Sequence, residues 1–108
     1  KNFPLVIDEY RKIIHPSSRE MFLGGYAFMQ TGNYKQSASI FQSLMTQNNL
    51  TGQRMYQDES EYYLLLSLIH LKQYKEALSI AEQINKDSYH TYHTKITSWL
   101  LLKLKWLS

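Results

Sequence analysis

The hexapeptide GNYKQS (residues 32–37) recurs in similar form 40 residues later as KQYKEA (residues 72–77). Each copy lies between two stretches whose apolar residues recur at helical spacing. Repeats of about 20–50 residues are typical of stacked helical arrays, in which no unit buries its apolar face alone. The repeat therefore predicts an all-α chain built from antiparallel helical hairpins.

Six helices are predicted around these two turns. They cover residues 4–14, 17–31, 33–46, 59–72, 74–85 and 87–107. Gly32 is expected to end the second helix. The polar stretch 47–57 is predicted to be a loop, with an extra turn of helix as the alternative for part of it. Capping boxes, in which a side chain at the helix start and one three residues later bond to each other's backbone, are predicted for the pairs Ser17–Glu20, Asn33–Gln36 and Asp58–Glu61.

Composition limits the function classes. A chain of 108 residues suffices for one domain, expected here to be a piece of a longer protein. The net charge is +3, but the basic residues are scattered, which argues against nucleic-acid binding. The chain has no Cys for a thiolate metal site and no run of about 18 apolar residues. Without a phosphate loop or a recognisable catalytic motif, we predict neither an enzyme nor a bound cofactor.

Small and large residues alternate through the two hairpins in a recurring pattern. The first hairpin carries Met21, Gly24, Gly25, Phe28, Gly32, Asn33, Tyr34, Ser37, Phe41 and Leu44, and the second carries Glu61, Leu64, Leu65, Leu68, Tyr74, Ala77, Ala81 and Ile84. This pattern resembles tetratricopeptide (TPR) repeats over residues 18–86, although the spacing of 40 exceeds the typical 34. The layout is also similar to the repeat regions of bacterial membrane-tethered TPR proteins, which implies a bacterial protein, cytoplasmic or tethered by another part of the chain.

The resemblance implies a short right-handed superhelix. Its parts would be a leading helix (1–16), a first repeat (17–46), a linker (47–57), a second repeat (58–86) and a capping helix (87–108). Small residues would let the helices of one hairpin approach closely, and large ones would fill the space between hairpins.

In TPR proteins the first helix of each hairpin lines a concave groove that captures a peptide or a helix. The corresponding positions here are Arg19, Phe22, Tyr26, Met29, Gln30, Glu59, Tyr62, Leu66, Ile69 and His70. The resemblance thus implies a non-catalytic protein-interaction scaffold whose partner is another protein or peptide. The alternative for Phe22, Tyr26 and Tyr62 is that they pack against neighbouring helices and fill the groove.

The last stretch, ITSWLLLKLKWL (residues 96–107), is apolar nearly all round and is too short to span a bilayer. It predicts a second, different function: an oligomerisation module that self-associates through Trp99, Leu102 and Trp106. Contact with a membrane surface is the less favoured interpretation, because a one-sided amphipathic face is missing from the pattern.

His90 and His93 are three residues apart and could share one helix face. A stable zinc site needs a third or fourth ligand, and Asp87 is the only nearby candidate. We therefore predict that the two histidines belong to a solvated helix start, without a metal.

Overall fold

In the computed structural model, residues 2–108 are described and form six α-helices and one 3₁₀ turn, with no β-strand among them. The elements are α1 (Phe3–Arg11), α2 (Ser18–Gln30), α3 (Tyr34–Thr51), α4 (Gln57–His70), α5 (Tyr74–Lys86), η1 (His93–Lys95) and α6 (Ser98–Leu107). The prediction of an all-α chain is confirmed.

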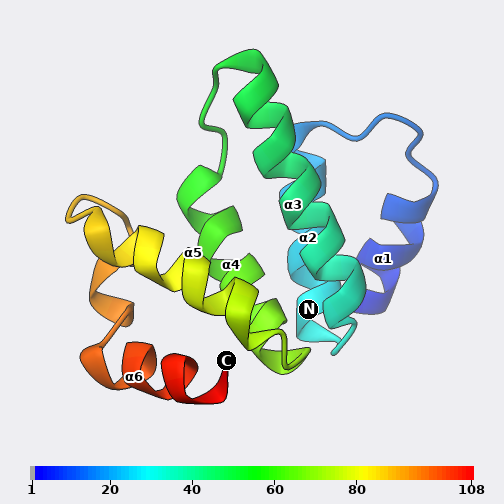
Figure 1. The fold of residues 1–108 in the computed structure, drawn as a ribbon. Coiled ribbons are helices and arrows are strands. Elements are labelled where there is room, and N and C mark those ends of the chain that lie inside the picture. The colour runs from blue at the N-terminus through cyan, green and yellow to red at the C-terminus, as the bar shows by residue number, and fades with distance from the viewer. Residues whose placement is uncertain (1) are drawn as a thin grey trace.

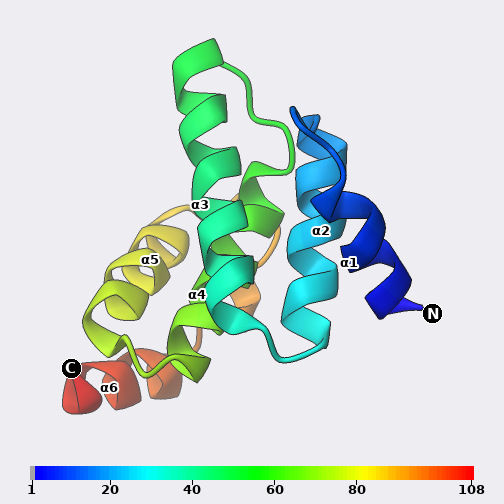
Figure 2. The same cartoon turned by 90° about the vertical axis from the view of Figure 1, so that its right-hand side faces the viewer.

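Each helix packs against the helix that follows it in sequence, and α2 also contacts α4. Figures 1 and 2 show the consequence: α1 and α6 lie at opposite ends of the molecule, with α2 to α5 between them. The helix α1 packs on α2, whereas α6 packs on α5. Each terminal helix therefore has one side against the rest of the molecule and another side without a helical neighbour.

The two repeated hexapeptides form the same turn. Gly32 and Lys72 both have left-handed backbone conformations, with φ of 81° and 61°. The next residue, Asn33 or Gln73, donates its N–H to the carbonyl five residues back, at 2.8 and 2.9 Å respectively. This hydrogen bond ends the preceding helix in both copies. The sequence repeat is thus also a repeat of backbone geometry.

Glycines in the middle of α2 permit close helix packing. A Cβ atom at Gly25 would lie 2.9 Å from the ring of Phe41, and one at Gly24 would lie 2.5 Å from the ring of Tyr10. Either contact would be too short for a real side chain, so both positions require glycine. Phe41 also belongs to the main core, which consists of Phe41, Leu64, Leu65, Leu68, Ala77, Ala81, Ile84, Ile96 and Leu104.

In the stretch 47–57, predicted to be a loop with an extra turn of helix as the alternative for part of it, α3 continues to Thr51 and the link to α4 is 52–56. Asn48 is buried, and its side-chain amide donates to the Met55 carbonyl at 2.9 Å and to the Gln57 side chain at 2.8 Å. These bonds satisfy a polar group inside the structure and tie the end of α3 to the start of α4. Gly52, with φ of 71°, then ends α3.

The last predicted helix begins later than expected. Residues 87–97 form turns and η1, and α6 starts at Ser98 after Thr97, whose hydroxyl accepts the Leu100 N–H at 3.1 Å. At the other end of the chain, α1 stops at Arg11, three residues before the predicted end.

Only one of the three predicted capping boxes forms. The Ser17 hydroxyl accepts the Glu20 N–H at 3.2 Å, and the Glu20 carboxylate accepts the Ser17 N–H at 2.8 Å. Asn33 makes no side-chain capping bond to α3. The Asp58–Glu61 prediction is wrong, because α4 starts at Gln57 after Tyr56 and both carboxylates face a distant segment.

Candidate functional site

Aromatic rings gather where α2, α4 and the 87–97 segment approach one another. Tyr63 of α4 lies at the centre of this aromatic cluster, with its ring centroid 5.5–6.1 Å from five other rings. The cluster comprises Phe3, Phe22, Tyr26, Phe41, Tyr56, Tyr62, Tyr63 and Tyr92. Tilted and offset ring pairs at such distances are favourable beyond their buried area.

One edge of this cluster opens into a groove of about 570 Å³. Its walls come from α1 with its cap, from α2 and from α4, and the lining residues are Asn2, Phe3, Val6, Phe22, Leu23, Tyr26, Ala27 and Tyr63. Most of this lining is apolar or aromatic, and the residues with polar side-chain groups are Asn2, Tyr26 and Tyr63. We call this feature the α1–α2–α4 groove.

Two of the ten residues at the TPR groove positions, Phe22 and Tyr26, line this groove together, with their rings stacked at 6.4 Å. Phe22 also stacks on Tyr56 at 4.7 Å. Tyr62 instead stacks on Tyr92 at 4.3 Å and so packs within the molecule. The two alternatives, an open groove and internal packing, therefore apply to different residues.

The other eight predicted positions do not line the groove. Ile69, like Tyr62, packs against the main core, and the exposed His70 stacks on Tyr34 at 4.1 Å. The remaining five are exposed or half-buried: Arg19, Met29, Gln30, Glu59 and Leu66.

Sequence reasoning missed Tyr63 and Leu23, which both line the groove. These two residues are 40 positions apart, the same interval as the repeated hexapeptides. Phe22 and Tyr62 are also 40 apart, but only Phe22 lines the groove, so the repeat interval alone does not identify groove residues. Phe3 and Val6 were also missed. The repeat pattern contains no information about them, because α1 lies outside it.

The three residues predicted for self-association share one exposed side of α6. Trp99 is 71% exposed, Leu102 59% and Trp106 83%. Together with Lys103 and Leu107 they line a shallow hollow of about 380 Å³. We call this feature the α6 face.

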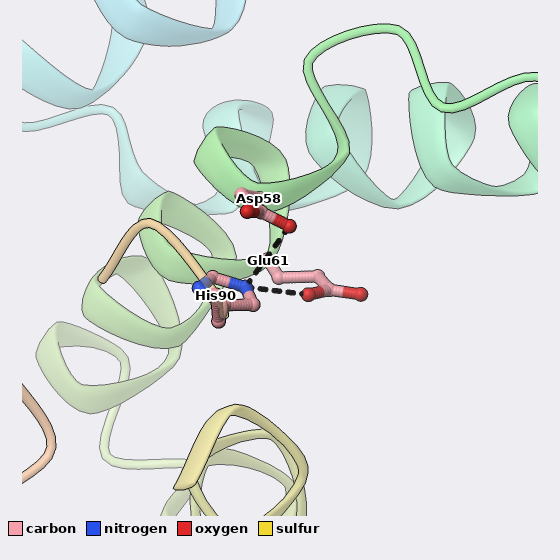
Figure 3. A group of neighbouring side chains, drawn as sticks. All are labelled: Asp58, Glu61 and His90. Carbon is pink, nitrogen blue, oxygen red and sulfur yellow. Dashed lines mark hydrogen bonds and ion pairs between the residues drawn. The ribbon is translucent and has the colours of Figure 1, made fainter. Parts of the chain in front are cut away.

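A third feature is a group of two carboxylates and a histidine (Figure 3). Asp58 and Glu61 come from the first turns of α4, and His90 comes from the segment after α5. The His90 Nε2 atom lies 2.8 Å from Glu61 Oε1 and 3.5 Å from Asp58 Oδ1. Next to His90, the N–H and the hydroxyl of Thr91 both donate to Asp58 Oδ2 at 2.9 Å.

The prediction of a solvated position for His90 is therefore wrong, since this residue is only 6% exposed. His93 does not join it, because the His93 Nδ1 atom faces the Ile84 carbonyl at 3.4 Å. The partners of His90 come from residues about 30 positions earlier, so local spacing could not identify them. We call the group of Asp58, Glu61 and His90 the His90 latch.

The hydrogen bonds define the tautomer of His90. The Tyr92 N–H donates to the Nδ1 atom at 3.1 Å, so Nδ1 is the acceptor and Nε2 carries the proton that is donated to Glu61. The three side chains could in principle bind a metal, since their ligand atoms lie within 4.8 Å of one another. A metal on Nε2, however, would require the proton on Nδ1, where the Tyr92 N–H already points. The geometry is that of a latch between two segments.

Two pKa shifts accompany these contacts. Burial alone would raise the pKa of Asp58, but the Thr91 hydrogen bonds and the charge of Arg54 lower it overall. The pKa of Tyr92 is raised, first because burial disfavours the phenolate and second because of a hydrogen bond with Tyr63. Asp58 is thus held ionised and Tyr92 neutral.

No protein-family model, curated protein or solved structure matches the chain. The functional argument therefore depends on the geometry of the α1–α2–α4 groove, the α6 face and the His90 latch.

Proposed function

We propose that this chain is a non-catalytic protein-interaction module that binds an apolar segment of another protein in the α1–α2–α4 groove. The observation that carries the proposal is the groove itself: about 570 Å³ of mostly apolar, aromatic-lined space on the surface of a small helical domain. Val6 and Leu23 are partly exposed at this groove, although burying them would be favourable.

The proposal includes a TPR-like architecture, with α2–α3 and α4–α5 as two repeats stacked into a short right-handed superhelix. Three observations support it. Helices adjacent in sequence pack on each other, α2 also contacts α4, and both repeated hexapeptides form the same helix-ending turn. In such an array, α2 and α4 would line the inner surface, which is where Phe22, Tyr26 and Tyr63 lie.

The groove suits a ligand with one or two large apolar side chains. Aromatic walls supply large contact areas at a low cost in conformational entropy, as is typical of the centres of protein interfaces. The Asn2 side-chain N–H and the Tyr26 hydroxyl would bond to the backbone of the bound segment and orient it. The Asn2 side-chain oxygen already accepts the Leu5 N–H, and the Tyr63 hydroxyl is already bonded to Tyr92. No charged residue lines the groove, so binding would depend little on salt.

A non-catalytic role agrees with the hydrogen bonds and ion pairs that the His90 latch makes within the fold. Each of its three side chains already has hydrogen-bond or ion-pair partners within the fold. A general base or a metal ligand would need a free lone pair directed at a substrate or an ion. The latch therefore serves to hold the 87–97 segment against α4.

The proposal is tested by selecting peptides from a random displayed library against the wild-type chain and measuring their affinities by calorimetry. We expect peptides with apolar anchors, and we expect Leu23→Asp and Tyr26→Ala each to weaken their binding about tenfold or more. Matched controls are Leu50→Asp and Tyr89→Ala, at side chains that are 80% and 95% exposed and lie outside the groove. Failure to select any peptide, or equal effects of groove and control variants, would contradict the proposal.

A further inference from the structure

The helix α6 uses one side for folding and leaves the other exposed. Leu104 is buried in the main core, and Leu100 and Leu101 pack against that core. On the opposite side Trp99, Leu102 and Trp106 are the exposed residues of the α6 face. The all-round apolar sequence of this helix thus combines a core-facing side with a separate exposed stripe.

The charged residues in this last part of the sequence have one sign. Lys103 lines the α6 face, and Lys95 and Lys105 are exposed nearby in sequence. Residues 88–108 contain three lysines and no Asp or Glu. An exposed apolar stripe with basic neighbours is complementary to a surface that is apolar inside and negatively charged outside.

We propose that the α6 face docks onto the surface of an anionic lipid bilayer, with α6 lying in the plane of the headgroups. Tryptophan and lysine are the residues that favour this position, because the indole ring sits at the headgroup level and the lysine side chain reaches anionic lipids. Trp99, Leu102 and Trp106 would enter the interface, while Leu104 keeps α6 attached to the protein. None of the helices in residues 2–108 has the length and hydropathy needed to cross a membrane.

A second copy of the chain fits the α6 face less well. In a symmetric dimer the same patch meets itself, which would bring Lys103 and its neighbouring lysines towards their own copies. Residues 88–108 contain no acidic residue, and none of the residues that line the α6 face is acidic. An anionic bilayer offers an apolar interior for the exposed side chains and negatively charged headgroups for the lysines.

Vesicles provide the test, because the only two tryptophans of the chain both lie on the α6 face. Intrinsic tryptophan emission therefore reports on this surface alone. The probes are vesicles of phosphatidylcholine with about 30 mol% phosphatidylserine, which matches a charged leaflet, and vesicles of phosphatidylcholine alone. We expect a blue shift and co-sedimentation with the anionic vesicles, both weakened by raised salt, and little effect of the neutral vesicles.

Two substitutions on the face should weaken this binding. Leu102→Asp and Lys103→Glu are each expected to reduce the partition coefficient about tenfold or more. Leu50→Asp, at an exposed leucine on α3, is the matched control and should change it little apart from a small effect of net charge. Circular dichroism checks that each variant keeps its helical content, and Trp106→Ser, at a side chain 83% exposed, provides a further variant if Leu102→Asp fails to fold.

Three results would overturn the inference. The first is the absence of binding to anionic vesicles, and the second is equal binding to neutral ones. The third is a blue shift that appears without lipid as concentration rises, accompanied by a doubled mass in light scattering, which would assign the face to a second copy. The groove proposal survives any of these outcomes, because the α1–α2–α4 groove and the α6 face share no residue.

Discussion

At the end of α4, Lys72 occupies a backbone conformation that suits glycine better. Its φ is 61°, and the equivalent position in the first repeat is Gly32 with φ of 81°. A side chain in the left-handed region costs about 1–2 kcal/mol, because Cβ approaches the following carbonyl oxygen, and part of this is offset by the lower backbone entropy of a non-glycine residue in the unfolded chain. We therefore expect Lys72→Gly to raise the free energy of unfolding by about 1 kcal/mol.

Urea denaturation followed by circular dichroism measures this change. A glycine at an ordinary helical position of α5 should have the opposite effect, so Glu82→Gly serves as the control and should lower the free energy of unfolding by about 1 kcal/mol. If Lys72→Gly destabilised the chain by a similar amount, the left-handed turn would not be the source of strain at this position.

At the scale of elements, the His90 latch connects the 87–97 segment to the start of α4. Asp58 accepts two hydrogen bonds from Thr91 and lies 3.5 Å from His90 Nε2. Replacing Asp58 by Asn removes the charge and weakens these bonds, so we expect Asp58→Asn to lower the free energy of unfolding by about 1–2 kcal/mol at pH 7. Hydrogen exchange should show faster exchange of the Thr91 amide in the variant.

The pH dependence of this effect follows from the lowered pKa of Asp58. The carboxyl group ionises more readily in the folded chain than in the unfolded chain. Its contribution to the free energy of unfolding is therefore fully present above its unfolded pKa of about 3.9, and it is lost as the pH falls through the pKa of the folded chain. The difference in the free energy of unfolding between wild type and Asp58→Asn should therefore shrink below about pH 4. Asp8→Asn, at an exposed position on α1, should show neither the loss at pH 7 nor this pH dependence.

Elements with local signals were predictable from sequence, and elements held by distant partners were not. The ends of α2 and α5 lie within one or two residues of the prediction, since the Ser17–Glu20 box and Gly32 mark the ends of α2 and apolar spacing defines α5. The extension of α3 to Thr51 depends on Asn48. The hydrogen-bond partners of its side chain, Met55 and Gln57, lie after the end of α3. The turns at 87–97 depend on His90 and its contacts with α4.

The residues of the candidate surfaces also fall into those that could be predicted from sequence and those that could not. Trp99, Leu102 and Trp106 were identifiable because an apolar helix of ten residues can bury only one side against a single neighbour. Phe22 and Tyr26 followed from the resemblance to TPR repeats. The groove around them was not predictable, because Phe3 and Val6 reach it only through the packing of α1 on α2.

For the whole molecule, we expect half-buried tyrosines to limit stability at high pH. The pKa values of Tyr10, Tyr62 and Tyr92 are all raised, in each case chiefly because burial disfavours the phenolate. Tyr10 lies against Gly24 where α1 packs on α2, and Tyr62 stacks on Tyr92 where α4 meets the 87–97 segment. Both of these contacts between segments therefore contain a phenol whose neutral form is favoured in the folded chain.

Above pH 10 the unfolded chain releases phenolic protons that the folded chain retains. The unfolded state then binds fewer protons, so the free energy of unfolding falls as the pH rises, by up to about 1.4 kcal/mol per pH unit for each such tyrosine. Urea denaturation between pH 8 and pH 11, an interval of about three units around the tyrosine pKa, should show this loss. Tyr92→Phe should make the decline shallower, whereas Tyr89→Phe, at a ring 95% exposed, should leave it unchanged. An unchanged decline in Tyr92→Phe would mean that the phenol of Tyr92 does not limit stability, and that groups elsewhere in the chain cause the alkaline loss.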